Sequence, residues 1–129
     1  MRHPKVLIAD DDRAMRSALR ARLSAWGYTP IEAADGLEVI GTATGQDLAA
    51  VILDQAMPRG DGMSVARLIR RECEVPIIFL SGWPANVFES VAEELPNIQV
   101  LNKPLDAAQL RETLREIIDK SAGRTPQIA

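Results

Sequence analysis

Residues 51–58 read Val-Ile-Leu-Asp-Gln-Ala-Met-Pro, and this segment decides the fold. Its first three residues are apolar and two are β-branched, which is typical of the end of a strand buried on both faces. The strand ends at the carboxylate of Asp54, and Pro58 keeps a helix from starting before it. Open α/β sheets bind ligands outside the carboxyl ends of their strands, so Asp54 stands where such chemistry takes place. On this segment alone, a simple turn-capping role for Asp54 stays open.

The composition limits what the chain can be. Its 129 residues, 47% hydrophobic and 26% charged, fit one globular domain. A net charge of −3, with no Lys/Arg run interleaved with aromatics, argues against nucleic acid as a direct partner. We expect no membrane partner, because no apolar segment approaches the about 20 residues of a span. Nothing at the N-terminus resembles a signal peptide, and the single Cys73 cannot form an internal disulfide, so we expect a cytoplasmic location.

Five apolar segments alternate with five helical patterns. The expected strands cover residues 6–9, 28–33, 50–54, 76–80 and 98–101. The expected helices begin after Asp12, at Gly36, near Met63, at Pro84 and after Asp106. This alternation predicts an α/β domain with a parallel sheet and, through right-handed crossovers, helices on both faces. One domain is expected over residues 1–120, with residues 121–129 as a flexible tail or the start of a linker.

Two elements carry specific expectations. Residues 28–33 are expected near a sheet edge, because Pro30 lacks an N–H donor. The helix from Gly36 to Gly45 is the weakest element, because glycine disfavours helix. Four arginines of the first helix are expected to form a solvated outer face: Arg13, Arg16, Arg20 and Arg22.

Polar side chains follow four of the five expected strands. They are Asp10 and Asp11 after the first, Asp54 after the third, Ser81 after the fourth and Lys103 after the fifth. Each alone has an ordinary explanation as a helix start, a turn or a strand exit. The carboxyl ends of parallel strands share one rim of the sheet, so these groups are expected to converge on one site.

Convergence of these groups indicates phosphoryl chemistry. Three carboxylates on one rim repel each other and require a cation, and Mg²⁺ suits hard oxygen ligands of this kind. A metal held by Asp10 and Asp11 would clamp a phosphoryl group while Asp54 attacks it as a carboxylate nucleophile. Lys103 and the Ser81 hydroxyl would bind other phosphoryl oxygens.

As a set, these positions resemble the receiver domain of two-component response regulators, over about residues 5–120. The matching positions are Asp10-Asp11, residues 54–58 with Met57-Pro58, Gly62 after Asp61, Ser81 and Lys103-Pro104. The resemblance implies a doubly wound, flavodoxin-like (βα)5 fold, with a five-stranded parallel sheet in the order 2-1-3-4-5. It also implies a cis peptide bond between Lys103 and Pro104.

The resemblance further implies a function and its partners. Asp54 would accept a phosphoryl group from a histidine kinase or a histidine phosphotransfer protein. Asp11, Asp54 and the Ala56 carbonyl would ligate Mg²⁺, and Asp10 would act through a water. Beyond self-catalysed acceptance and hydrolysis, no enzyme activity is expected. The signal would pass to an unknown output protein, and a phosphorylation-dependent homodimer through the fourth helix, fifth strand and fifth helix would be one form of output.

Three residues depart from the family pattern. Val100 stands where many receivers have a Tyr or Phe that changes rotamer on activation. Trp83 is bulky for a position near the attacking water, and Leu105 replaces a frequent Phe. The acceptor residues match the family, whereas these departures affect the downstream switch.

Three other functions use similar residues. A haloacid-dehalogenase-like phosphatase needs a second acid two residues after the nucleophile, where this chain has Ala56. A nucleotide-binding module needs a glycine-rich loop, and Gly60 with Gly62 is too little for G-x-G-x-x-G. A degenerate receiver that acts only as a scaffold is disfavoured because all the polar groups are present.

Overall fold

The computed structural model describes residues 3–55, 62–82 and 95–124, with side chains as far as residue 120. Three features named above therefore lie outside the described residues: the helix expected to begin at Pro84, the side chain of Trp83 and the carbonyl of Ala56. Among the described helices, none is long and apolar enough to cross a membrane.

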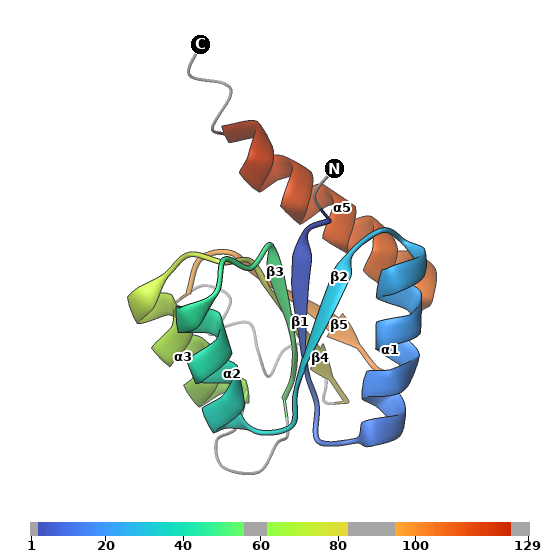
Figure 1. Cartoon of the computed structure of the whole chain (residues 1–129), viewed down its shortest axis with the longest axis horizontal. Coiled ribbons are helices and arrows are strands. Elements are labelled where there is room, and N and C mark those ends of the chain that lie inside the picture. The colour runs from blue at the N-terminus through green and yellow to red at the C-terminus, as the bar shows by residue number, and fades with distance from the viewer. Residues whose placement is uncertain (1–2, 56–61, 83–94, 125–129) are drawn as a thin grey trace.

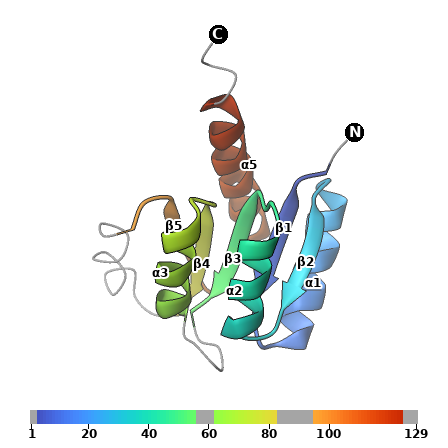
Figure 2. The same ribbon diagram turned by 60° about the vertical axis from the view of Figure 1, so that its left-hand side comes forward.

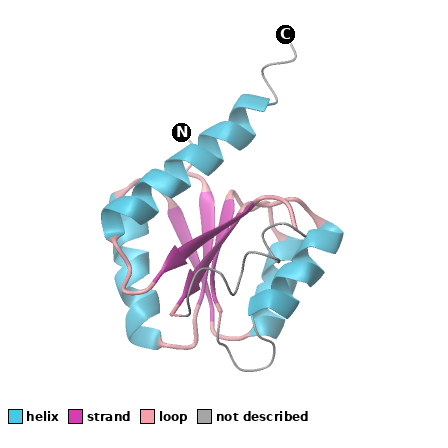
Figure 3. Ribbon diagram, turned by 180° about the vertical axis from the view of Figure 1, so that it is seen from behind, coloured by secondary structure: helices cyan, strands magenta, loops and turns pink. Residues whose placement is uncertain are grey.

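Five parallel strands form one sheet in the order β2-β1-β3-β4-β5 (Figure 3). They are β1 (Lys5–Ala9), β2 (Thr29–Ala33), β3 (Ala50–Asp54), β4 (Ile77–Ser81) and β5 (Ile98–Asn102). All five expected strands and their predicted order are confirmed. β2 is an edge strand, where the missing donor of Pro30 is tolerated.

The described helices cover both faces of the sheet (Figures 1 and 2). On one side lie α1 (Arg13–Ala25) and α5 (Ala107–Arg124), and on the other lie α2 (Gly36–Gly45) and α3 (Gly62–Glu72). The doubly wound α/β architecture is thus confirmed. The helix α5 runs to Arg124, four residues beyond residue 120, where the sequence placed the end of the domain.

Each face of the sheet has its own apolar core, and β3 contributes to both. Val51 and Leu53 pack toward α2 and α3, whereas Ala50 and Ile52 pack toward α1 and α5. All five residues of β3 are buried, as the apolar run predicted. The strand that carries Asp54 is therefore the most enclosed part of the scaffold together with β4, whose five residues are also buried.

Side chains fix the helix starts that the sequence indicated. The carboxylate of Asp12 caps α1 by accepting from the backbone N–H groups of Ala14 and Met15. Asp106 accepts in the same way from Ala108 and Gln109 at the start of α5. These caps fix the starts of α1 and α5. The loops that lead into the two helices are therefore short, covering residues 10–12 after β1 and residues 103–106 after β5.

Candidate functional site

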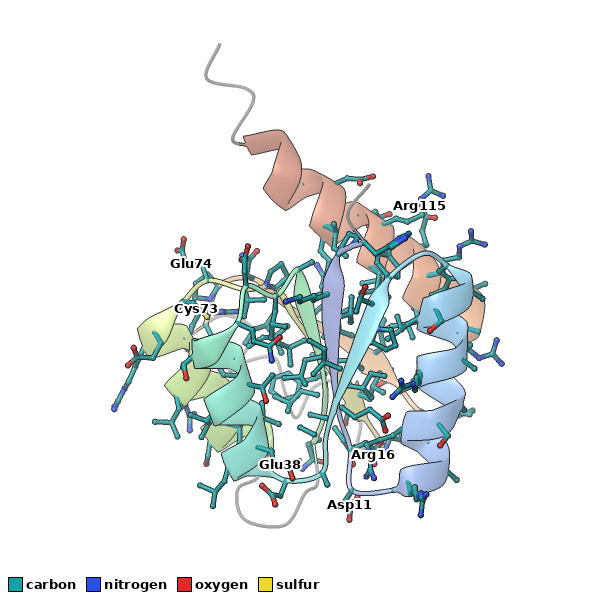
Figure 4. All side chains as sticks on the ribbon, in the orientation of Figure 1. Asp11, Arg16, Glu38, Cys73, Glu74 and Arg115 are labelled. Atoms are coloured by element: carbon teal, nitrogen blue, oxygen red, sulfur yellow. The ribbon has the colours of Figure 1, made fainter. Side chains whose placement is uncertain are left out.

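The carboxyl ends of the strands bring the predicted residues to one edge of the sheet. Ala9 pairs with Leu53, and Asp54 pairs with Leu80, so β1, β3 and β4 end level with one another. Figure 4 shows Asp11 at this edge with Glu38, opposite the edge that carries Cys73, Glu74 and Arg115.

Three carboxylates meet at this edge. One carboxylate oxygen from each of Asp10, Asp11 and Asp54 lies within 4.8 Å of the others. Asp10 is 3% exposed and Asp54 is 5% exposed, whereas Asp11 is exposed to solvent. Two of the three acids are therefore removed from water, and the third faces it.

Lys103 supplies the positive charge of the cluster. Its Nζ donates a hydrogen bond to Asp54 Oδ1 at 2.8 Å. Burial by itself lowers the pKa of Lys103, but the hydrogen bond to Asp54 and the charges of Asp54, Asp10 and Asp11 outweigh it and raise the pKa overall. The ammonium group is therefore held in its charged form. The Lys103–Pro104 peptide bond is cis, as the resemblance implied.

The charged form of the Asp10 carboxylate is destabilised despite the nearby Lys103, and its pKa is raised. Burial raises its pKa most, and repulsion from Asp54 and Asp11 adds to the rise. The backbone N–H of Asp12, which donates to Asp10 Oδ1 at 2.9 Å, and the charge of Lys103 offset this only in part. Three carboxylates against one ammonium leave a deficit of positive charge. A donor set of oxygen ligands with that deficit fits a hard divalent cation.

Ser81 and Gly62 complete the surroundings of Asp54. Ser81 ends β4, is fully buried, and its carbonyl accepts from the backbone N–H of Lys103 at 2.8 Å. At Gly62 a side chain would have no room, because a Cβ there would lie 2.8 Å from the Asp54 carbonyl oxygen and 2.9 Å from Phe79 Cε1. The absence of a side chain at Gly62 thus lets α3 start directly against the end of β3.

Sequence reasoning missed Arg16. We expected its side chain on the solvated face of α1, and this was wrong, because the side chain is only 16% exposed. Its Nη1 donates to the Asp10 carbonyl oxygen at 2.7 Å, and its Nε donates to Glu32 Oε1 at 3.2 Å. Only the position of Arg16 four residues after the N-cap Asp12, facing back toward β1, could have hinted at this contact.

A surface hollow lies at the other end of the sheet. It measures about 600 Å³, opens at the amino ends of β1 and β3, and is lined by His3, Pro4, Lys5, Asp47, Leu48 and Ala49. It contributes no group to the acidic cluster.

Comparison with known proteins agrees with this geometry. The family model "Response regulator receiver domain" matches residues 6–115. The chain is 33% identical over 118 residues to the probable transcriptional regulator ycf27 of Porphyridium aerugineum, covering 92% of this chain and 49% of that protein. It is 28% identical over 121 residues to the aerobic respiration control protein ArcA of Escherichia coli K12, covering 94% and 51%. The chain thus spans about half the length of these curated relatives.

Solved structures give the same fold. The receiver domain of the sensor histidine kinase PA1611 from Pseudomonas aeruginosa PAO1 matches with a TM-score of 0.81 and 27% identity, covering 91% of this chain and 98% of that one. That structure has a magnesium ion coordinated in its active-site cleft. The receiver domain of the Francisella response regulator 1452 matches with a TM-score of 0.86 at 23% identity, covering 92% and 99%, which supports the fold. This chain belongs to the family of response regulator receiver domains, the signalling modules of two-component systems.

Proposed function

We propose that this domain is a phosphoacceptor, and that Asp54 receives a phosphoryl group from a phosphohistidine. The observation that carries the proposal is the position of Asp54: it lies in a cluster with two other carboxylates, with the Lys103 ammonium 2.8 Å from its Oδ1. A carboxylate that is buried and paired with an ammonium group on one oxygen is suited to act as a nucleophile.

The transfer step follows from these positions. Asp54 Oδ2 attacks phosphorus, an Oδ2–P bond forms, and the P–N bond of the donor histidine breaks. The electron pair leaves with the imidazole nitrogen, and Asp54 becomes an acyl phosphate. The Lys103 ammonium, already on Asp54, then pairs with a phosphoryl oxygen, and the Ser81 hydroxyl donates to another. Little more than positioning and charge neutralisation is required of the protein.

Mg²⁺ is part of this proposal, and the carboxylate donor set described above supports it. Asp11 and Asp54 would hold the ion directly with the Ala56 carbonyl, and Asp10 would hold it through a water. When bound, the ion would neutralise charge on the phosphoryl oxygens. The magnesium in the receiver domain of PA1611 is consistent with this assignment.

The partners follow from the chemistry. The donor would be a histidine kinase or a histidine phosphotransfer protein, because phosphohistidine is a high-energy phosphoramidate that can phosphorylate a carboxylate. The receiver would act on an output protein, and a homodimer through β5, α5 and the segment between β4 and β5 is one form that this output could take. A cytoplasmic site of action belongs to the same proposal and is supported by the unpaired Cys73.

The first experiment identifies the acceptor residue. The protein is incubated with Mg²⁺ and acetyl phosphate, and intact mass should rise by one phosphate. Asp54→Asn should abolish this rise, because an amide oxygen is a poor nucleophile. Asp47→Asn, at the opposite edge of the sheet, serves as the control and should still be modified. Modification of the Asp54→Asn variant would refute the assignment.

A turnover assay on the same protein distinguishes a receiver from a phosphatase. A haloacid-dehalogenase-like phosphatase would turn over many equivalents of a small phosphate ester such as p-nitrophenyl phosphate. We expect no such turnover, because the position two residues after Asp54 carries no acid to protonate a leaving group. Sustained turnover that depends on Asp54 would favour the phosphatase.

A further inference from the structure

Arg16 joins three parts of the molecule at the edge of the site. It lies one turn into α1, and its guanidinium donates from Nη1 to the carbonyl oxygen of Asp10 and from Nε to Glu32 on β2. The second carboxylate oxygen of Glu32 accepts from Arg20 Nη1 at 2.8 Å. Arg16 thus connects α1 with the end of β1 and with β2.

These contacts complete the restraint of Asp10. Its N–H donates to the Ala33 carbonyl at 3.2 Å, its side-chain Oδ1 accepts from the Asp12 N–H, and its carbonyl accepts from Arg16. In the first two bonds the partner of Asp10 is a backbone group of Ala33 or Asp12. In the third the partner is the side chain of another residue, Arg16, and this bond holds the peptide that links Asp10 to Asp11.

This peptide carries an unfavourable charge arrangement. Asp10 is buried beside Asp54, Asp11 follows directly, and mutual repulsion favours any movement that spreads the carboxylates. A loop free to relax would have to be reordered when a cation binds, and that cost would lower affinity. A loop held in place presents its oxygens ready for the ion.

We propose that Arg16 is a positioning residue for the metal site: it holds the Asp10–Asp11 peptide so that both carboxylates stay directed at a divalent cation. The inference rests on the proposed function and deepens it. Arg16 acts through the Asp10 carbonyl and does not itself touch the ion.

The contacts require arginine at this position. A planar guanidinium can donate to the Asp10 carbonyl and the Glu32 carboxylate at once, in fixed directions. Glu32 keeps the fork in orientation. The hydrogen bond from Arg20, followed by that from Arg16, lowers the pKa of Glu32, whose ordinary value already leaves it charged at neutral pH without Arg20. A lysine would present a single ammonium and could not reproduce both bonds at these angles.

The test measures Mg²⁺ binding by calorimetry in the whole chain, with no phosphodonor present. Arg16→Ala should weaken Mg²⁺ affinity about tenfold, the lower end of what second-layer changes at metal sites produce. Arg16→Lys should weaken it severalfold, and this variant covers the case in which the alanine variant does not fold. Arg20→Ala is the matched control: it removes the other bond to Glu32 on the same helix but touches no part of Asp10, so affinity should stay near wild type.

A second readout separates positioning from general stability. Phosphorylation by acetyl phosphate should need more Mg²⁺ for half-maximal rate in Arg16→Lys, but reach the wild-type rate at saturating Mg²⁺. Unchanged Mg²⁺ affinity in the Arg16 variants, or equal weakening in Arg20→Ala, would overturn the inference. A wild type that binds no Mg²⁺ would overturn it together with the metal assignment. Mg²⁺ binding that depends on Arg16, without phosphorylation of Asp54, would overturn the proposed function alone.

Discussion

At the scale of single residues, Asp10 shows a conflict between stability and function. Its buried carboxylate has a raised pKa, so its charged form disfavours the folded state at neutral pH. The same charge is useful once a cation is present. The site therefore holds an arrangement that is unfavourable for the metal-free protein and favourable for ion binding.

This conflict leads to a prediction for Asp10→Asn. An amide keeps an oxygen that can accept from the Asp12 N–H but carries no charge, so the metal-free protein should gain on the order of 1 kcal/mol in unfolding free energy. Urea unfolding with EDTA present measures the gain. Mg²⁺ affinity should fall in the same variant. Asp11→Asn, at an exposed position, should change metal-free stability by less than about 0.5 kcal/mol. A metal-free Asp10→Asn protein less stable than wild type would contradict the argument.

The candidate site itself could be predicted residue by residue, apart from Arg16. Asp10, Asp11, Asp54 and Lys103 all lie within two residues of the carboxyl end of a strand, and parallel strands bring such positions to one edge. Arg16 could not be found this way, because an arginine repeated every three to four residues on a helix is equally the pattern of a solvated face. The group that it contacts is the backbone carbonyl of Asp10, and a backbone group leaves no pattern in the amino-acid sequence.

At the scale of elements, α2 forms although its composition disfavours it. The helix contains glycines and threonines, yet Asp35 Oδ1 accepts from the Glu38 N–H at 3.0 Å, and Glu38 Oε2 accepts from the Ala34 N–H at 2.7 Å. These reciprocal bonds are a capping box shifted by one residue. Local propensity made this the weakest prediction, and the cap, together with packing of Val39 and Ala43, decides the outcome.

Two glycines in neighbouring helices should respond to alanine in opposite ways. Gly62→Ala would place a Cβ 2.8 Å from the Asp54 carbonyl, so we expect a loss of about 1–3 kcal/mol and slower phosphorylation as Asp54 shifts. Gly41, in the middle of α2, has nothing within 4 Å of an added Cβ. There alanine should stabilise by about 0.5–1 kcal/mol and leave phosphorylation unchanged. Denaturant unfolding and acetyl phosphate labelling measure both, and a tolerated Gly62→Ala would show that the contact can yield.

At the scale of the whole molecule, a cation bound at the proposed metal site would also stabilise the fold. The three carboxylates come from the ends of β1 and β3, which pair only in the folded sheet, so a cation bound among them stabilises the entire domain. The unfolding free energy should rise by about 2.7 kcal/mol at a Mg²⁺ concentration of 100 times Kd. Thermal unfolding with and without Mg²⁺ measures this. Asp11→Asn should remove most of the response, and an equal response in that variant would place the ion elsewhere.

The global architecture was the most predictable level. The strand order, both helix layers and the edge position of β2 follow from the alternation of elements, the right-handed crossover and the resemblance to receivers. The end of α5 was less predictable. Residues beyond 120 lack apolar periodicity, but the helix continues through Gly123 to Arg124, because a helix in progress needs no core contact to add a few residues.

The contact between Lys103 and Asp54 joins residues 49 positions apart, and this has a consequence for the order of folding during synthesis. All three acids leave the ribosome before the lysine that balances them. Until β5 emerges, β4 also lacks the neighbour on its outer side. A nascent chain that ends before residue 103 would hold its acids uncompensated beside an open sheet edge, so we expect it to stay sensitive to protease. The domain would gain protection in one late step, when its final strand arrives.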